Sequence, residues 1–261
     1  MLQDNAGVVR AEKQPAFWMR IQPPLSRLAC RLLSMSSASK LTAVTIPALK
    51  SPATSTIIFV HGLGDSGHGW APVARQLQPH FPNSRFVLPN APHQKVTCNY
   101  GMVMPSWYDI YSLEEDLGQD EQGLYQSKQR LLDLIQHESE TQHIPTENII
   151  LGGFSQGAVM SALTGLTSSI KLGGLFFLSG YIPLHEKLPS TFTDANKQTP
   201  IFIAHGEQDE LIKAKFGEMS KDLLLSRGYM VEWHLYKGMG HEASMEEIMH
   251  LQKWLENIIP Q

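Results

Sequence analysis

The 261-residue sequence has few cysteines, and it has no apolar run of the about 18 residues that a membrane-spanning helix needs. The two cysteines are Cys30 and Cys98, and Cys30 falls in an atypical amino-terminal segment, so we expect no structural disulfide and a reducing compartment. The sequence also has no block of lysine or arginine, and its formal net charge is −4. A surface for nucleic acid is therefore not expected.

Motifs for metals and cofactors are also missing. There is no H-E-x-x-H, and the two cysteines do not stand near histidines at ligand spacing. No G-x-G-x-x-G follows a strand and opens a helix, and the glycine-rich residues 61–67 lack the lysine of a P-loop. The sequence predicts neither a metal nor a cofactor.

Acidic residues are absent between Lys13 and Gly64, although basic residues occur throughout this segment. Residues 20–35 are rich in Arg, Ser and Leu, which is the composition of a mitochondrial presequence. The alternatives are a disordered extension and upstream initiation, with Met35 as a second start. S-acylation of Cys30 among these residues is a further hypothesis. We therefore treat residues 1–40 as a disordered or targeting extension and residues 41–261 as one domain.

Strand-like and helix-like patterns alternate from about residue 41 onward. The expected strands are 56–60, 85–88, 149–154, 175–179, 200–204 and 229–236. The expected helices are 70–77, 120–141, 156–167, 213–227 and 244–259, and an irregular section runs from 89 to 109. This alternation predicts an α/β fold with a mostly parallel central sheet and helices on both faces.

The segment Gly-Phe-Ser-Gln-Gly at 153–157 lies between an apolar strand and a helix. A G-x-S-x-G at such a junction is typical of a nucleophile elbow, in which a strained turn holds the serine hydroxyl out of the fold. Small neighbours are needed there because strand and helix approach each other closely. We therefore expect Ser155 to be a nucleophile.

Two further polar residues follow expected strands, in the order Ser155, Asp209 and His241. Sites in α/β sheets form at the carboxyl ends of the strands, and this is the triad order of α/β-hydrolases. A serine hydroxyl attacks well only when an imidazole takes its proton, and a carboxylate orients that imidazole. The sequence thus predicts Asp209 as the acid and His241 as the base.

Other residues of the same types remain alternatives. For the acid they are Glu207, Glu210 and Asp194, of which Glu207 is the nearest competitor. His241 is preferred among the 11 histidines because its flexible, glycine-containing loop lies between the last strand and the last helix. We expect His234 to be a surface or packing residue, His250 to be solvated and His205 to be structural.

A hydrolase of this type also needs two N–H donors for the oxyanion. One is expected at Gln156, directly after the nucleophile and at the positive end of a helix. The other is expected in the loop after the first buried strand, at Leu63, because Gly62 and Gly64 allow the backbone to aim its amides at one point. A plain glycine turn is the alternative for this loop.

Together these motifs resemble the acyl-protein thioesterase and lysophospholipase family, within the carboxylesterase branch of α/β-hydrolases. The matching segments are FVHGLGDSGHGW (59–70), PNAP (89–92), MPSWYDI (104–110), EDLGQDEQGL (115–124), NIILGGFSQG (148–157), LSGYIP (178–183), HGEQDELI (205–212) and GMGHEAS (238–244). The resemblance covers about residues 41–261 and is to a fungal or other eukaryotic member. It implies the same triad, Ser155, Asp209 and His241, with Leu63 and Gln156 as oxyanion donors. Ala158 is a departure, since members often have a second glycine there.

Only about 20 residues separate the strands expected near Ser179 and Pro200, so no lid domain is expected. An open site of this kind suits a fatty-acyl thioester on a protein cysteine, chiefly S-palmitoyl. Apolar residues that could form the wall of an acyl channel are Met102, Val103, Met104, Pro105, Trp107 and Leu113.

The expected activity is therefore hydrolysis of palmitoyl thioesters through an acyl-serine intermediate. The alternatives are a lysophospholipase or small-ester carboxylesterase with the same triad and, more remotely, a non-catalytic hydrolase-fold binding protein. By resemblance, the partners are S-palmitoylated proteins such as G-protein α subunits and Ras-like proteins, with transient membrane contact and a weak homodimer. A cytoplasmic and nuclear location is expected, with mitochondrial targeting as the alternative.

Overall fold

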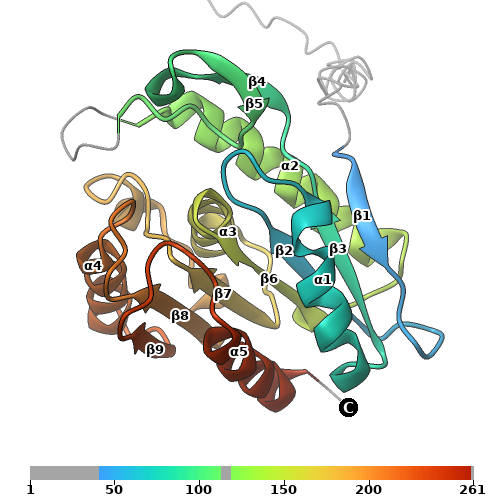
Figure 1. Ribbon diagram of the computed structural model, residues 1–261. Helices are drawn as coiled ribbons and strands as arrows, with labels where there is room; N and C mark the ends of the chain where they lie inside the picture. The colour runs from blue at the N-terminus through green and yellow to red at the C-terminus, as the bar shows by residue number, and fades with distance from the viewer. Residues whose placement is uncertain (1–40, 113–118, 260–261) are drawn as a thin grey trace, which may run out of the picture. The chain divides into compact units, whose positions relative to one another are not determined.

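The computed structural model describes residues 41–112 and 119–259. The predicted extension over residues 1–40 and the predicted wall residue Leu113 lie outside the described residues. Within the described part, a seven-stranded sheet forms the centre of the fold and helices pack on both of its faces (Figure 1).

The sheet has the strand order β1-β3-β2-β6-β7-β8-β9. Its strands are β1 (Ala43–Ile46), β2 (Ser55–Val60), β3 (Ser84–Pro89), β6 (Ile149–Phe154), β7 (Gly174–Leu178), β8 (Ile201–Gly206) and β9 (Val231–Tyr236). All neighbours pair in parallel except β1, which runs antiparallel along the edge of β3. The predicted α/β-hydrolase fold with a mostly parallel sheet is thus confirmed.

Five α-helices of the described residues are divided between the two faces of the sheet. They are α1 (Gly67–Leu77), α2 (Glu121–Glu140), α3 (Gln156–Thr167), α4 (Ala214–Ser226) and α5 (Met245–Ile258). Residues of α1 and α5 belong to one hydrophobic core cluster, and residues of α2, α3 and α4 belong to the other. Side chains cap two of the helices: Asp120 accepts from the N–H of Gly123 in α2, and Ser244 accepts from the N–H of Glu247 in α5.

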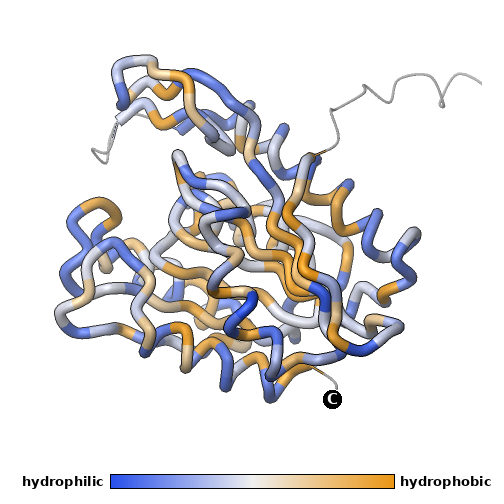
Figure 2. The backbone as a smooth tube through the Cα atoms, turned by 45° about the vertical axis from the view of Figure 1, so that its right-hand side comes forward, coloured by the Kyte–Doolittle hydropathy of each residue, from blue (hydrophilic) through white to orange (hydrophobic). Residues whose placement is uncertain are grey.

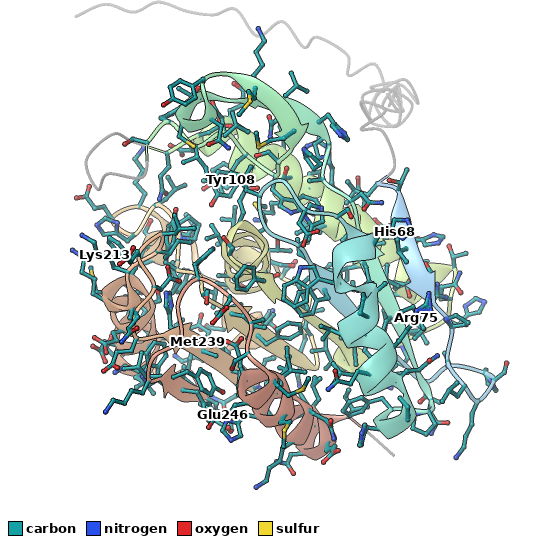
Figure 3. The ribbon with its side chains drawn as sticks, in the orientation of Figure 1. His68, Arg75, Tyr108, Lys213, Met239 and Glu246 are labelled. Atoms are coloured by element: carbon teal, nitrogen blue, oxygen red, sulfur yellow. The ribbon has the colours of Figure 1, made fainter. Side chains whose placement is uncertain are left out.

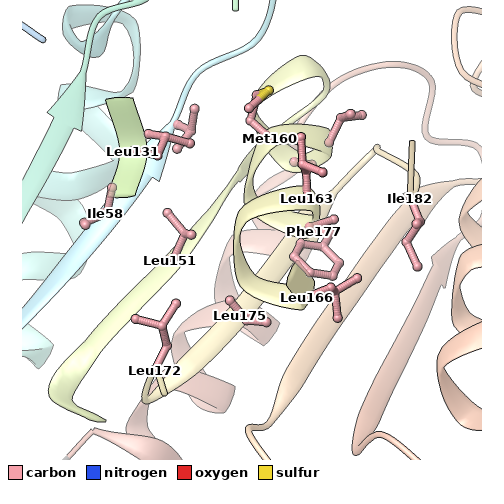
Figure 4. Packing of buried hydrophobic residues seen from close by; sticks show 14 of the residues in the cluster. Ile58, Leu131, Leu151, Met160, Leu163, Leu166, Leu172, Leu175, Phe177 and Ile182 are labelled. Carbon is pink, nitrogen blue, oxygen red and sulfur yellow. The ribbon is translucent and has the colours of Figure 1, made fainter. Parts of the chain in front are cut away.

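The alternation of side chains along β2 explains why there are two cores. Ile57 and Phe59 join one cluster, whereas Ile58 and Val60 join the other, because successive residues of a strand point to opposite faces. Such strands read as continuous apolar runs, visible as the orange centre of Figure 2. Figure 4 shows α3 packed over β6 and β7, with Leu163 of α3 near Phe177 of β7.

Two features of the fold were not predicted. The section from 89 to 109 was expected to be irregular, but it contains a hairpin of β4 (His93–Val96) and β5 (Met102–Pro105). The edge strand β1 was not predicted either. Both are short and partly exposed, so neither has the continuous apolar run that identifies a buried strand.

The connection between β7 and β8 contains only two short 3₁₀ helices, η6 (Leu188–Thr191) and η7 (Asp194–Asn196), in agreement with the expected absence of a lid domain. The other 3₁₀ helices of the described residues are η3 (Gln78–His80), η4 (Thr97–Asn99) and η5 (Thr146–Asn148). In the described part of the chain, no helix has both the length and the apolar content required to cross a bilayer.

Candidate active site

Ser155 occupies the turn between β6 and α3 in a strained conformation. Its φ of 55° and ψ of −121° lie in a region that residues with a side chain rarely adopt. Two glycines make this turn possible, since a Cβ at Gly153 or Gly157 would lie 2.2 or 2.0 Å from the carbonyl oxygen of Val60. The end of β2 therefore packs closely against this turn, and Ser155 lies at the carboxyl end of the sheet.

The structure brings Ser155, His241 and Asp209 together in one chain of hydrogen bonds. The hydroxyl of Ser155 lies 2.9 Å from Nε2 of His241, and Nδ1 of His241 lies 2.7 Å from Oδ2 of Asp209. A carboxylate only accepts, so Nδ1 carries the hydrogen and Nε2 is free to accept the proton of the serine. This is the arrangement that general-base activation of a serine requires.

Asp209 is buried, yet it is held in its charged form. Burial alone raises the pKa of a carboxyl, but hydrogen bonds from several donors outweigh it and hold the pKa of Asp209 well below its usual range. The donors are the rings of His205 and His241 and the backbone N–H groups of Leu211 and Ile212. The carboxylate can therefore stabilise a positive charge on His241.

The alternative acids do not reach the triad histidine. Glu207 and Glu210, which flank Asp209 in the loop after β8, are exposed to solvent. The side chain of Asp194 is 97 % exposed and pairs with Lys197. Only Asp209 of these four residues contacts His241 through a hydrogen bond.

The other histidines have different partners. His234 stacks on Phe202, as expected for a packing residue, and lies 2.8 Å from Glu232. His250 is half-buried, so it keeps part of the expected contact with solvent, and its Nδ1 lies 3.0 Å from the hydroxyl of Tyr236. His205 is fully buried, and its Nε2 lies 2.7 Å from the carbonyl oxygen of Ile212 and 3.4 Å from Oδ2 of Asp209. His205 thus has the expected structural role, and its ring also lies beside the carboxylate of Asp209.

The two segments predicted to supply oxyanion donors lie next to Ser155. A Cβ at Gly62 would lie 3.2 Å from Cβ of Ser155, so the loop that holds Leu63 passes directly beside the nucleophile. Gly64 in the same loop has a φ of +76°, and its N–H donates to the carbonyl of Pro105. Gln156 begins α3, where backbone N–H groups have no partner within the helix.

The predicted wall residues occupy different environments. Met102 and Val103 are exposed on β5, with 56 % and 61 % of their surface accessible. Met104 and Pro105 are half-buried, and Sδ of Met104 lies 3.9 Å from the position of a Cβ at Gly64. These two residues therefore lie close to the loop of Leu63.

Trp107 does not fit its predicted role as a wall residue. It is 1 % exposed, and its indole N–H donates to the carbonyl oxygen of His61 at 2.9 Å. A side chain with so little accessible surface offers no face to an acyl chain. Trp107 is instead a buried residue that is hydrogen bonded to the start of the loop that contains Leu63.

A cavity of about 580 Å³ lies between the segment after β7 and helix α4. Its apolar lining residues include Tyr181, Ile182, Leu184, Phe216, Met219 and Leu223. Gly180, the residue before the lining residue Tyr181, packs against the start of α3, since a Cβ there would lie 3.3 Å from the carbonyl oxygen of Ser155. None of Ser155, Asp209, His241 and Leu63 lines the cavity. None of these lining residues was predicted from the sequence.

The sequence analysis missed the contributions of three side chains to the site. His205 precedes Asp209 by four residues directly after a strand, and His61 precedes the first glycine of its loop, so position alone could have suggested both. The side chain of Gln156, which bonds to the segment 106–108, had no such signal, because that contact joins residues about 50 positions apart. Figure 3 shows Tyr108 of this segment above α3 and Met239 on the loop before α5.

Comparison with known proteins gives consistent matches over the domain. The phospholipase/carboxylesterase family matches residues 41–259. Acyl-protein thioesterase 1 of Yarrowia lipolytica is 43 % identical over 223 residues, which cover 83 % of this chain and 97 % of that relative. Acyl-protein thioesterase 1 of Neurospora crassa is 40 % identical over 235 residues, which cover 87 % and 95 %. The crystal structure of acyl-protein thioesterase 2 of Zea mays superposes with a TM-score of 0.75 at 26 % identity, covering 84 % of this chain and 99 % of that one.

Proposed function

Because the chain belongs to the phospholipase/carboxylesterase family, we propose that it is a serine hydrolase that removes fatty-acyl groups, chiefly palmitoyl, from protein cysteines. The observation that carries this proposal is the hydrogen-bonded chain of Ser155, His241 and Asp209. The names of the relatives support the choice of acyl thioesters on proteins as substrates.

The reaction follows from the geometry of the three residues. Nε2 of His241 takes the proton of Ser155 while Oγ attacks the thioester carbonyl carbon, and Asp209 stabilises the resulting imidazolium. The backbone N–H groups of Leu63 and Gln156 hold the oxyanion of the tetrahedral intermediate. The C–S bond then breaks, the cysteine leaves as a thiol with the proton from His241, and an acyl-Ser155 ester remains.

Water completes the cycle in the same site. His241 takes a proton from water, the hydroxide attacks the acyl-Ser155 carbonyl, and the C–Oγ bond breaks as the proton returns to Ser155. The products are a fatty acid and the free enzyme. Because a thiolate is a good leaving group, His241 contributes more as the base for attack than as the acid for departure.

The apolar cavity supports a long acyl chain as the substrate. Its volume of about 580 Å³ falls within the usual range of ligand pockets, and its lining residue Tyr181 follows Gly180, which packs against the start of α3. We propose that the acyl chain lies along Phe216 and Leu223 of α4 while its carbonyl carbon sits at Ser155. A lysophospholipid could place its acyl chain in the same way, so this activity is the second candidate.

Two substrates of equal acyl length distinguish these candidates. We would measure kcat/KM for a palmitoyl-cysteine peptide and for palmitoyl lysophosphatidylcholine, with the wild type and with Ser155→Ala. The proposal predicts a preference for the peptide and its loss in the variant. A preference for the lipid would make the protein a lysophospholipase, and unchanged turnover by Ser155→Ala would exclude the mechanism.

A pair of substitutions on α4 tests the cavity. Leu223→Trp fills it, so we expect kcat/KM for a palmitoyl substrate to fall about 10-fold or more while that for a butyryl substrate changes little. The matched control is Leu225→Trp, since Leu225 lies on the same helix but is 49 % exposed. Equal effects on both chain lengths would show that the acyl chain lies elsewhere.

We further propose a transient contact between the β4–β5 hairpin and a membrane surface. Its apolar residues Tyr100, Met102 and Val103 are 97 %, 56 % and 61 % exposed. The substitution Val103→Glu should lower turnover of a peptide on a vesicle but leave turnover of a soluble thioester unchanged.

The particular acylated partners, the weak homodimer and the cytoplasmic and nuclear location stay predictions from the sequence.

A further inference from the structure

Two side chains that take no direct part in the reaction, those of Trp107 and His61, are hydrogen bonded to carbonyls of the loop that contains Leu63. The indole N–H of Trp107 donates to the carbonyl oxygen of His61 at 2.9 Å. Nδ1 of His61 lies 2.6 Å from the carbonyl oxygen of Gly62, the next residue. Two consecutive carbonyls of the loop are therefore bonded to the framework of the protein.

The hydrogen bonds of His61 fix its tautomer. Nε2 lies 3.0 Å from the backbone nitrogen of Ala91, whose N–H can only donate, so Nε2 is an acceptor without a hydrogen. Burial lowers the pKa of His61, which agrees with a neutral ring. The single hydrogen of that ring is then on Nδ1 and is donated to Gly62.

The orientation of one peptide group follows from this bond. In a trans peptide the carbonyl of Gly62 and the N–H of Leu63 point in opposite directions. Fixing the Gly62 carbonyl on His61 therefore fixes the direction of the Leu63 N–H, which is the proposed oxyanion donor. The N–H of Asp65 also donates weakly to Gly62, at 3.3 Å, and closes the turn around this peptide.

The same framework reaches the other oxyanion donor. The side chain of Gln156 accepts from the backbone N–H of Trp107 at 2.8 Å and donates to the carbonyl oxygen of Tyr108 at 2.7 Å. Gln156 thus fixes Trp107 with its side chain, while its own backbone N–H, the proposed oxyanion donor, is at the first position of α3 and has no partner within the helix. The rings of Trp107 and His61 also pack together, with centroids 5.3 Å apart.

We propose that Trp107 and His61 are positioning residues that align the Leu63 N–H with the Gln156 N–H through the sequence of contacts Gln156–Trp107–His61–Gly62. This inference rests on the proposed function, because it assumes that these two N–H groups bind the oxyanion. An oxyanion hole works only when its donors are already aligned before charge develops. Loosening the framework should therefore slow the chemical step and leave substrate binding largely unchanged.

The substitution Trp107→Phe tests the first contact, since it removes the N–H and keeps an aromatic ring. We expect kcat for a soluble acyl thioester to fall about 10-fold, with KM within twofold of the wild type, because Trp107 does not line the cavity. The matched control is Trp254→Phe, in the core cluster on the other face of the sheet, which should leave kcat within twofold. Equal kcat values for the two variants would overturn the proposal.

A spectroscopic readout separates alignment from mere stability. A fluorophosphonate bound to Ser155 places an oxygen at the oxyanion position, and amide protons that donate to it move downfield in an NMR spectrum. In Trp107→Phe the Leu63 amide shift should shrink while that of Gln156 stays as in the wild type. An unchanged Leu63 shift would contradict the proposal.

The pair His61→Asn and His61→Leu tests the second contact, and it remains informative if Trp107→Phe does not fold. Both variants lose the bond from Ala91, but only asparagine keeps a donor near the position of Nδ1. We expect kcat of His61→Asn to exceed that of His61→Leu about fivefold, and equal values would overturn this step. Ser155→Ala in the same assay tests the proposed function separately: if it is inactive and the framework variants are unaffected, only the positioning role fails.

Discussion

The loop after β8 and the first turn of α5 each bury one carboxyl group, and the pKa values of the two groups are shifted in opposite directions. Asp209 is 4 % exposed and Glu247 is 0 % exposed. Asp209 accepts hydrogen bonds from two backbone N–H groups and from His241, and these bonds keep its pKa well below the usual range. The carboxyl oxygens of Glu247 have no hydrogen-bond partner among the described residues, and burial raises the pKa of Glu247 to about 8.

This difference shows that hydrogen-bond donors, and not the degree of burial, decide which buried carboxyl stays ionised. Only an ionised group can stabilise an imidazolium, so Asp209 suits the role of the triad acid. Glu247 is largely protonated at neutral pH and packs in the core without taking part in the site. Substituting each of the two carboxyl groups in turn tests this difference.

The largest effect is expected for Asp209→Asn. An amide at this position gives His241 the wrong tautomer, because its N–H₂ donates where the carboxylate accepted. We expect kcat to fall about 10⁴-fold, measured with a soluble acyl thioester. The matched change Glu247→Gln should leave kcat within twofold.

The exposed neighbour Glu207 provides the control for this prediction. Glu207→Gln changes the charge of the same loop without touching His241, so turnover should be retained. A large loss in Glu207→Gln combined with a small loss in Asp209→Asn would mean that Glu207 moves in to serve as the acid.

The second effect concerns stability. The pKa of Glu247 is raised from 4.5 to about 8, so the folded state binds a proton that the unfolded state releases between these values, and stability is lost as the pH rises through that window. Each unit of pKa corresponds to about 1.4 kcal/mol, which makes the loss a few kcal/mol by pH 8. Glu247→Gln should therefore raise Tm at pH 8 and change it little at pH 5.

The matched control is the adjacent Glu246, which is exposed in the same helical turn. Glu246→Gln should show no such dependence on pH. If Glu247→Gln and Glu246→Gln gave the same Tm difference at both pH values, the carboxyl of Glu247 would be paired or hydrated in solution.

The smallest effect is expected for His205, which supplies one donor to Asp209. Nε2 of His205 lies 2.7 Å from the Ile212 carbonyl and must carry a hydrogen, which also faces Oδ2 of Asp209 at 3.4 Å. His205→Leu removes this donor and brings Asp209 closer to the situation of Glu247. We expect about a 10-fold lower kcat, and His205→Gln, which keeps a donor of similar reach, should recover part of it. Identical rates for the two variants would show that His205 does not act through Asp209.

Much of the fold was predictable because its central elements bury both faces. The predicted bounds of β6 and α3 agree with the structure, since an apolar run, a glycine-rich turn and a helical pattern follow one another there. The hairpin of β4 and β5 could not be recognised, because its strands have only four residues each, pair only with each other and are largely exposed or half-buried, so neither has a continuous apolar run. Its turn also relies on a positive φ at Tyr100, which is unusual for a residue with a side chain.

Some residues of the candidate site could likewise be predicted from the sequence, and others could not. Ser155, Asp209 and His241 could be predicted because each follows a strand whose place in the sheet the sequence reveals. Trp107 was assigned to the substrate wall on the apolar character of its segment and the family resemblance, whereas its indole N–H is bonded to the carbonyl oxygen of His61. Contacts between distant segments, such as this one, depend on packing that no local pattern encodes.

Trapping the intermediate would show whether Ser155 carries the acyl group. The purified enzyme would be mixed with a palmitoyl-cysteine peptide, quenched in acid within milliseconds, digested and analysed by mass spectrometry. We expect a palmitoyl group on the peptide that contains Ser155, formed before the release of fatty acid reaches its steady rate and absent in Ser155→Ala. Steady turnover with the acyl group on another residue, or with full activity in Ser155→Ala, would contradict it.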